Sequence, residues 1–88
     1  MAPWQLRSIL AMAGKGLLAA FGQVVREARL GQGLTQEGLA FNAGLNRNFV
    51  MDIEKGRRKP SLITLFSLAK GLGISPAVLV SRTDQLQR

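Results

Sequence analysis

The side chains best suited to chemistry in this chain are basic and amide side chains concentrated in one stretch. Arg47 and Asn48 are adjacent, and the basic run Lys-Gly-Arg-Arg-Lys occupies residues 55–59. An arginine can donate to both acceptors of guanine, and an asparagine matches the acceptor and donor of adenine. Lysine and arginine also neutralise phosphates. The stretch therefore suggests recognition of a polyanion by charge and by paired hydrogen bonds.

The composition argues against catalysis and against a bound metal. The chain contains no His, no Cys and no Tyr, and only five acidic residues. The commonest general base, the thiolate nucleophile and the commonest metal ligands are therefore missing, and we expect no enzyme, no cofactor and no disulfide. Twelve Lys and Arg give a net charge of +7, which attracts nucleic acid or anionic lipid. Charge alone does not choose between them.

Helical periodicity and capping residues predict an all-α fold with five short helices and no strand. The predicted helices cover residues 19–30, 36–43, 47–55 and 62–72, followed by a short fifth helix that contains Leu79. Their N-terminal caps are Thr35, Asn46 and Ser61, while Ser75 and Pro76 start the fifth. The expected helix-ending glycines are Gly31, Gly33, Gly44, Gly56 and Gly73. On the fourth helix, Leu62, Leu65, Leu68, Ala69 and Leu72 form the predicted core stripe.

Two of these helices form a helix-turn-helix. The helices over 36–43 and 47–55 are joined by only three residues, with Gly44 where the chain turns. Ala40 is small enough for the two helices to cross closely. On the second helix of the pair Val50 and Ile53 face the core, so Asn48, Asp52 and Lys55 lie on the opposite face, flanked by Arg47 and Met51.

These motifs resemble the helix-turn-helix family of phage repressors, the Cro/CI or Xre type, including controller-like regulators of restriction-modification systems. The resemblance covers about residues 21–80 and rests on the segments 33–37, 39–40, 44–46, 53–56 and 60–62. It implies a compact repressor-like bundle, a third helix in the DNA major groove, and a homodimer on a palindromic operator. It also implies an ion pair between Arg29 and Glu54. Independently, a carboxylate on the stripe of Val50 and Ile53 requires a partner.

The predicted site has two parts. The expected contacts to DNA bases are Arg47, Asn48, Met51 and Asp52, and those to phosphates are Gln36, Asn46, Lys55, Arg57, Arg58 and Lys59. Alternatives remain for several: Arg47 could meet phosphate only, Met51 could pack instead of contacting a thymine methyl, and the basic run could be a solvated face. For Asp52 we weigh a cytosine amino group against neutralisation by a basic neighbour, which we favour.

The flanks of the expected domain, residues 19–81, are less defined. Residues 1–18 continue a helical apolar stripe and are interpreted as an added helix packed on this domain or on a partner, a disordered arm, or a membrane-surface helix. Residues 82–88 are expected to be a frayed polar tail. The dimer contact is placed at Val78 and Val80. The apolar stretch 9–21 is broken by Lys15 and two glycines, which argues against a membrane span and a signal peptide and favours a cytoplasmic protein.

The sequence thus predicts a dimeric transcriptional regulator, a repressor or controller protein, that binds specific double-stranded DNA. One rival is an antitoxin or protein-interaction module with secondary DNA binding, which would use residues 1–18 to hold a protein partner. Another is a membrane-surface protein, which predicts lipid-dependent helicity in residues 1–20.

Overall fold

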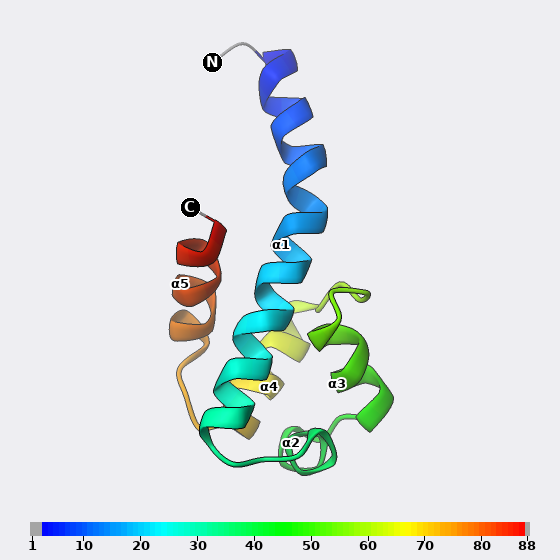
Figure 1. Ribbon diagram of the computed structural model, residues 1–88, viewed down its shortest axis with the longest axis vertical. Helices are drawn as coiled ribbons and strands as arrows, with labels where there is room; N and C mark the ends of the chain where they lie inside the picture. Colours follow the sequence, from blue (N-terminus) through cyan, green and yellow to red (C-terminus); the bar gives the residue numbers. More distant parts are fainter. Residues whose placement is uncertain (1–2, 88) are drawn as a thin grey trace.

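The computed structural model describes the backbone of residues 3–87 and the side chains of residues 16–87. Five α-helices make up the fold (Figure 1). They are α1 (Pro3–Gly31), α2 (Gln36–Ala43), α3 (Arg47–Glu54), α4 (Leu62–Leu72) and α5 (Pro76–Gln87). The described part of the chain contains no strand, so the predicted all-α, five-helix fold is confirmed.

Local capping sets the helix boundaries as predicted. The side-chain oxygens of Thr35, Asn46 and Ser61 accept hydrogen bonds of 2.9, 2.7 and 3.1 Å from backbone N–H groups two or three residues later. Each of them satisfies a donor that the first helical turn would otherwise leave unpaired. Gly44 and Gly73 end α2 and α4 with φ of 67° and 68°, in the left-handed region. Only glycine adopts that region at little cost.

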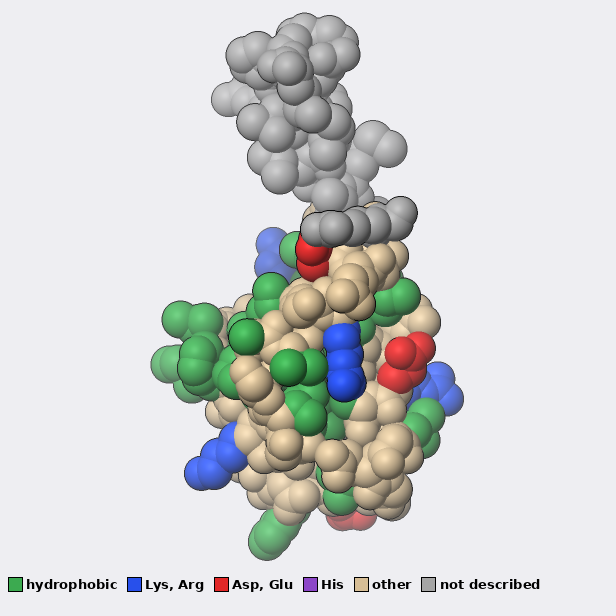
Figure 2. All heavy atoms as spheres, turned by 90° about the vertical axis from the view of Figure 1, so that its left-hand side faces the viewer, with side chains coloured by type: hydrophobic (Ala, Val, Ile, Leu, Met, Phe, Trp, Pro, Cys, Tyr) green, Lys and Arg blue, Asp and Glu red, His purple; other side chains and the backbone are tan. Residues whose placement is uncertain are grey.

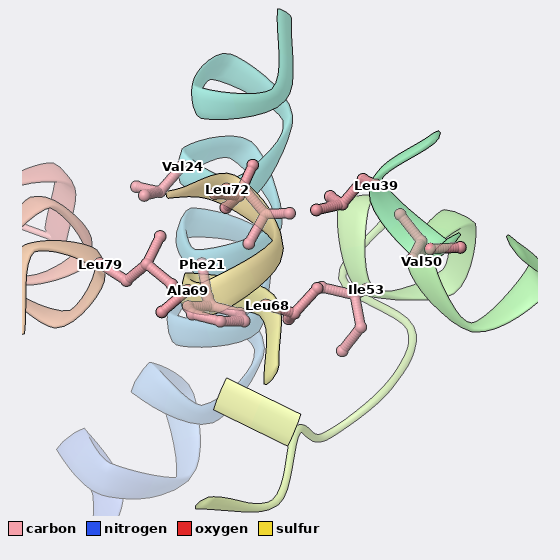
Figure 3. Close-up of a cluster of buried hydrophobic side chains, with 11 residues drawn as sticks. Phe21, Val24, Leu39, Val50, Ile53, Leu68, Ala69, Leu72 and Leu79 are labelled. Atoms are coloured by element: carbon pink, nitrogen blue, oxygen red, sulfur yellow. The ribbon is translucent and has the colours of Figure 1, made fainter. Parts of the chain in front are cut away.

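One hydrophobic core joins all five helices (Figure 3). In the figure, side chains from α1, α2, α3, α4 and α5 point toward a common centre. The fully buried large side chains are Val25, Leu39, Val50, Ile53, Leu68, Leu72 and Leu79. Figure 1 shows α3 and α5 on opposite sides of α1, which packs against both. Since α2 packs on α4 and α3 packs on α1, both helices of the helix-turn-helix are attached to the rest of the fold.

The predicted extra N-terminal helix is not a separate element. Residues 3–18 continue directly into the first helix of the domain, so that α1 forms one long rod projecting beyond the other helices (Figure 1). The side chains of residues 1–13 and of Lys15 lie outside the described residues. The interpretations of what that segment packs on therefore stay predictions, as does the division of the chain into 1–18, 19–81 and 82–88.

The last helix is longer than predicted. We expected the chain to fray after Ser81, yet α5 continues to Gln87. The reason is tertiary: α5 packs along α1, and Thr83 is buried with its hydroxyl donating to the Leu79 carbonyl at 2.7 Å. Contact with α1 along one face therefore holds a polar segment helical although most of its residues are exposed.

Two further features concern the length of the apolar helices and the grouping of acidic residues, both for the described residues. No single helix among them is long and apolar enough to cross a membrane, and α4 and α5 meet that criterion only as a pair bent by 102°. The described part of the chain also holds no cluster of three acidic residues able to hold a metal ion.

Candidate nucleic-acid interface

The helix α3 has one buried face and one exposed polar face. Val50 and Ile53 are buried in the core, whereas Arg47 and Asn48 are exposed. Met51 and Asp52 are partly exposed. The predicted base-contacting residues therefore lie on the solvent side of a helix whose other side is fixed by packing. This arrangement lets the polar side chains reach an external partner without disturbing the core.

A buried ion pair holds the end of α3 against α1. Arg29 donates to Glu54 from Nε at 2.7 Å and from Nη2 at 3.0 Å, and the two side chains are only 9% and 4% exposed. Arg29 also donates from Nη1 to the Leu34 carbonyl at 2.8 Å. The predicted pair is thus present as a two-pronged contact, the strongest form of arginine–carboxylate bonding. It ties α1, the loop before α2 and α3 into one unit.

A glycine allows the two helices to approach so closely. A Cβ added at Gly22 on α1 would lie 2.3 Å from the Ile53 carbonyl oxygen and 2.6 Å from that of Glu54. Any larger residue would push the end of α3 away from α1. Gly56, just after α3, adopts φ of 70° and lies against the Ala19 backbone, where a Cβ would be 3.1 Å away.

The predicted phosphate-contacting residues at the helix N-termini also have internal roles. Asn46 caps α3 by accepting from the Asn48 N–H at 2.7 Å. Gln36, at the start of α2, donates from Nε2 to Glu54 Oε1 at 3.2 Å. That bond positions Gln36 beside the ion pair and still leaves its second amide hydrogen and its carbonyl oxygen for another partner.

Positive charge gathers around α3 and the loop that follows it. Five of the twelve basic residues lie between positions 47 and 59. Lys55, Arg57 and Lys59 are exposed, and no ion pair is found for them among the described side chains. Lys55 and Arg57 follow directly after α3 and are open to solvent, whereas Lys59 also lines a groove between α1, α4 and α5. An anionic polymer lying along the exposed face of α3 would meet Lys55 and Arg57.

Arg58 differs from its neighbours because it folds back onto α3. Its guanidinium lies over the Phe49 ring, 4.7 Å from the centroid, within cation–π range. Its Nη2 also lies 3.5 Å from Asp52 Oδ2. The structure thus provides the basic neighbour that we favoured for Asp52. It also gives Arg58 partners within the chain, in addition to its predicted phosphate contact.

An exposed apolar groove lies beside α5, and Lys59 at the end of the basic run is one of its lining residues. It is formed between α1, α4 and α5, and its apolar lining includes Leu17, Leu62, Phe66 and Val80; we call it the apolar groove. The prediction that Leu62 lies in the core is wrong, because this side chain is 70% exposed at the first turn of α4. Figure 2 shows hydrophobic side chains gathered on this face. Of the two predicted dimer residues, Val80 lines the groove, whereas Val78 is exposed outside it.

Two site residues were not predicted from the sequence. Gly22 lies in the middle of α1. Phe49 has the sequence context of an ordinary apolar residue of α3. Nothing in their local spacing signals that one lies under the end of α3 or that the other supports Arg58, because both contacts are made across the fold. The Leu34 carbonyl, which accepts from Arg29, was not predicted either. Every residue has a backbone carbonyl, so the residue type does not indicate which carbonyl accepts a hydrogen bond.

The chain belongs to the helix-turn-helix family, whose model matches residues 25–79. This is the Xre type that the motifs resemble, a family of DNA-binding transcriptional regulators and not of enzymes.

Several similar proteins are controllers of restriction-modification systems. The control protein C.BamHI of Bacillus amyloliquefaciens is 42% identical over 64 residues, covering 72% of this chain and 79% of the relative. The crystal structure of the controller C.AhdI from Aeromonas hydrophila is 47% identical with a TM-score of 0.69, covering 70% of this chain and 94% of that one. The controller C.Esp1396I, solved as a tetramer with its 35 base-pair operator, is 31% identical with a TM-score of 0.75, covering 81% and 93%.

Proposed function

We propose that this protein binds a specific double-stranded DNA site as a homodimer and acts as a transcriptional repressor or controller protein in the cytoplasm. In this proposal α3 enters the major groove, Arg47 and Asn48 read base edges, and Met51 lies beside them. Phosphates are held by Gln36 and Asn46 at the helix N-termini and by the basic residues at 55, 57, 58 and 59.

One observation carries this proposal: α3 presents an exposed polar face while its opposite face is locked in the core. Arg47 and Asn48 stand at the N-terminal end of the exposed face, which is the end that contacts bases in helix-turn-helix proteins. Their donors suit guanine and adenine. The ion pair of Arg29 with Glu54 supports the proposal because it fixes the orientation of α3 relative to α1.

Selection of bound duplexes from a random pool tests the proposal. The winning duplex and a scrambled one are then titrated at two salt concentrations. We expect a two-fold symmetric site with half-sites about 34–36 Å apart, bound at least about 10³ times more tightly than the scrambled duplex. Equal binding of every duplex, abolished by salt, would leave only nonspecific charge attraction and refute the proposal.

We further infer that the apolar groove is the dimer interface. A two-fold interface must be self-complementary, and a mostly apolar face with exposed Leu62, Phe66 and Val80 can pair with its own copy. No residue of α3 lines the groove, so pairing there leaves the exposed face of α3 open, although Lys59 at the end of the basic run lies at the groove. The tetramer formed by C.Esp1396I on its operator supports an assembled form. Val78 is the weaker of the two predicted contacts, since residues two apart on a helix face in different directions.

Sedimentation equilibrium of a Val80→Glu variant tests this interface. A carboxylate placed among the apolar side chains of the paired groove loses its hydration, so we expect the dimer dissociation constant to rise at least tenfold, equivalent to about 1.4 kcal/mol. Phe41→Glu is the matched control, because Phe41 is 86% exposed on α2 and lies outside the groove. Equal effects of the two substitutions, or none, would place the interface elsewhere.

A further inference from the structure

The side chain of Asp52 is the one acidic group on the exposed face of α3, and it is engaged by Arg58. The distance from Arg58 Nη2 to Asp52 Oδ2 is 3.5 Å, and the two side chains are 49% and 32% exposed. This is a charge contact at a solvated surface and not a tight hydrogen bond. Such a contact can be exchanged for another anion.

The other side of Arg58 is held by Phe49. The ring packs against the hydrophobic core, so it is a fixed support for the guanidinium 4.7 Å above its centroid. The backbone assists, because the Arg57 N–H donates to the Asp52 carbonyl at 2.9 Å and folds the loop onto the end of α3. Arg58 is thereby placed against α3, whereas its basic neighbours extend into solvent.

We propose that Asp52 is a specificity-determining residue that competes with DNA phosphate for Arg58 and so weakens binding to non-cognate duplexes. The inference rests on the proposed function. On a duplex without matching bases, α3 gains only phosphate contacts, and the pairing with Asp52 withholds one of them.

A cognate duplex changes this balance. A carboxylate in the major groove accepts from the amino group of cytosine. Where the operator places such a donor opposite Asp52, the carboxylate exchanges Arg58 for the base, and the guanidinium becomes available to a phosphate. A non-cognate duplex offers no such donor at that place. Releasing Arg58 to its phosphate therefore breaks the contact with Asp52 without forming a new contact for the carboxylate. The ratio of the affinities for cognate and non-cognate duplexes therefore rises, although no further arginine contacts a base.

A mutant cycle of Asp52→Asn and Arg58→Gln tests the inference. The four proteins are titrated with the selected and the scrambled duplex over a range of salt concentrations. We expect Asp52→Asn to tighten binding to the scrambled duplex about threefold, without tightening binding to the selected one. The salt slope for the scrambled duplex should steepen by about 0.9, the value for one added phosphate contact. In the Arg58→Gln background, Asp52→Asn should change neither quantity.

Glu27→Gln is the control for net charge, because it removes one negative charge from the exposed surface of α1 at a side chain that accepts from Gln23 and takes no part in the contact of Asp52 with Arg58. It should leave the ratio of the two affinities and the salt slope unchanged. Equal tightening of both duplexes by Asp52→Asn, or an effect that persists with Arg58→Gln, would overturn the inference and leave the proposed function intact. If the unaltered chain binds both duplexes alike, the proposed function fails, and the inference fails with it.

Discussion

Removing Arg29 should destabilise the whole domain strongly. Replacing it with methionine keeps much of the side-chain volume but leaves the Glu54 carboxylate, 4% exposed, with only the Gln36 amide as a partner. Breaking a buried ion pair by deleting one member costs about 3–5 kcal/mol, since the remaining charge stays buried and uncompensated. The Leu34 carbonyl loses its arginine donor as well.

This loss is large compared with the total stability. At about 0.05–0.15 kcal/mol per residue, a chain of 88 residues has an unfolding free energy of about 4–13 kcal/mol. Urea unfolding followed by far-ultraviolet circular dichroism measures the change. The thermal midpoint serves as a second readout where Arg29→Met is partly unfolded without denaturant.

The double variant Arg29→Met/Glu54→Leu makes the prediction specific. Replacing a buried pair with apolar residues of similar volume is often neutral or stabilising, so the double variant should be at least about 2 kcal/mol more stable than the sum of the single losses predicts. As a control, Glu27→Gln alters an exposed carboxylate bonded to Gln23 and should change stability by less than about 0.5 kcal/mol. A loss below about 1 kcal/mol for Arg29→Met, or strict additivity, would refute the reasoning.

Two further predictions concern the placement and the chemistry of α3. Gly22→Ala should lower the unfolding free energy by about 1–3 kcal/mol or more, because its Cβ would lie 2.3 Å from the Ile53 carbonyl oxygen, whereas Gly14→Ala, with nothing within 4 Å, should raise it by up to about 1 kcal/mol. Equal effects of the two substitutions in urea unfolding would contradict the close approach of α1 to α3. Arg47→Ala should cost about 1–3 kcal/mol of binding to the selected duplex and relax the preference at one base position. Arg57→Ala, at an exposed residue outside the groove, should instead weaken all duplexes alike and lower the salt slope by about 1, and titrations in which the two variants behave identically would reject this division of roles.

The local features of this fold were predictable from the sequence because they depend on neighbouring residues. Thr35, Asn46 and Ser61 cap their helices with bonds that span two or three positions, and Gly44 and Gly73 end helices by a backbone preference of their own. The pattern of Val50 and Ile53 sets which face of α3 is buried, and therefore which polar residues are exposed. Motif spacing was also enough to identify the family and the ion pair.

The remaining features depended on contacts between residues far apart in the chain. The exposure of Leu62 and the helical state of residues after Ser81 follow from where α1 and α5 pack, which periodicity within one helix does not specify. The charge of Arg58 was evident, but its position over Phe49 and beside Asp52 exists only once the loop folds back onto α3. The sequence by itself thus determined the helices, the family and the chemistry of the exposed face. The tertiary structure decided which charges point outward and which apolar face remains open, because both result from the packing of whole helices.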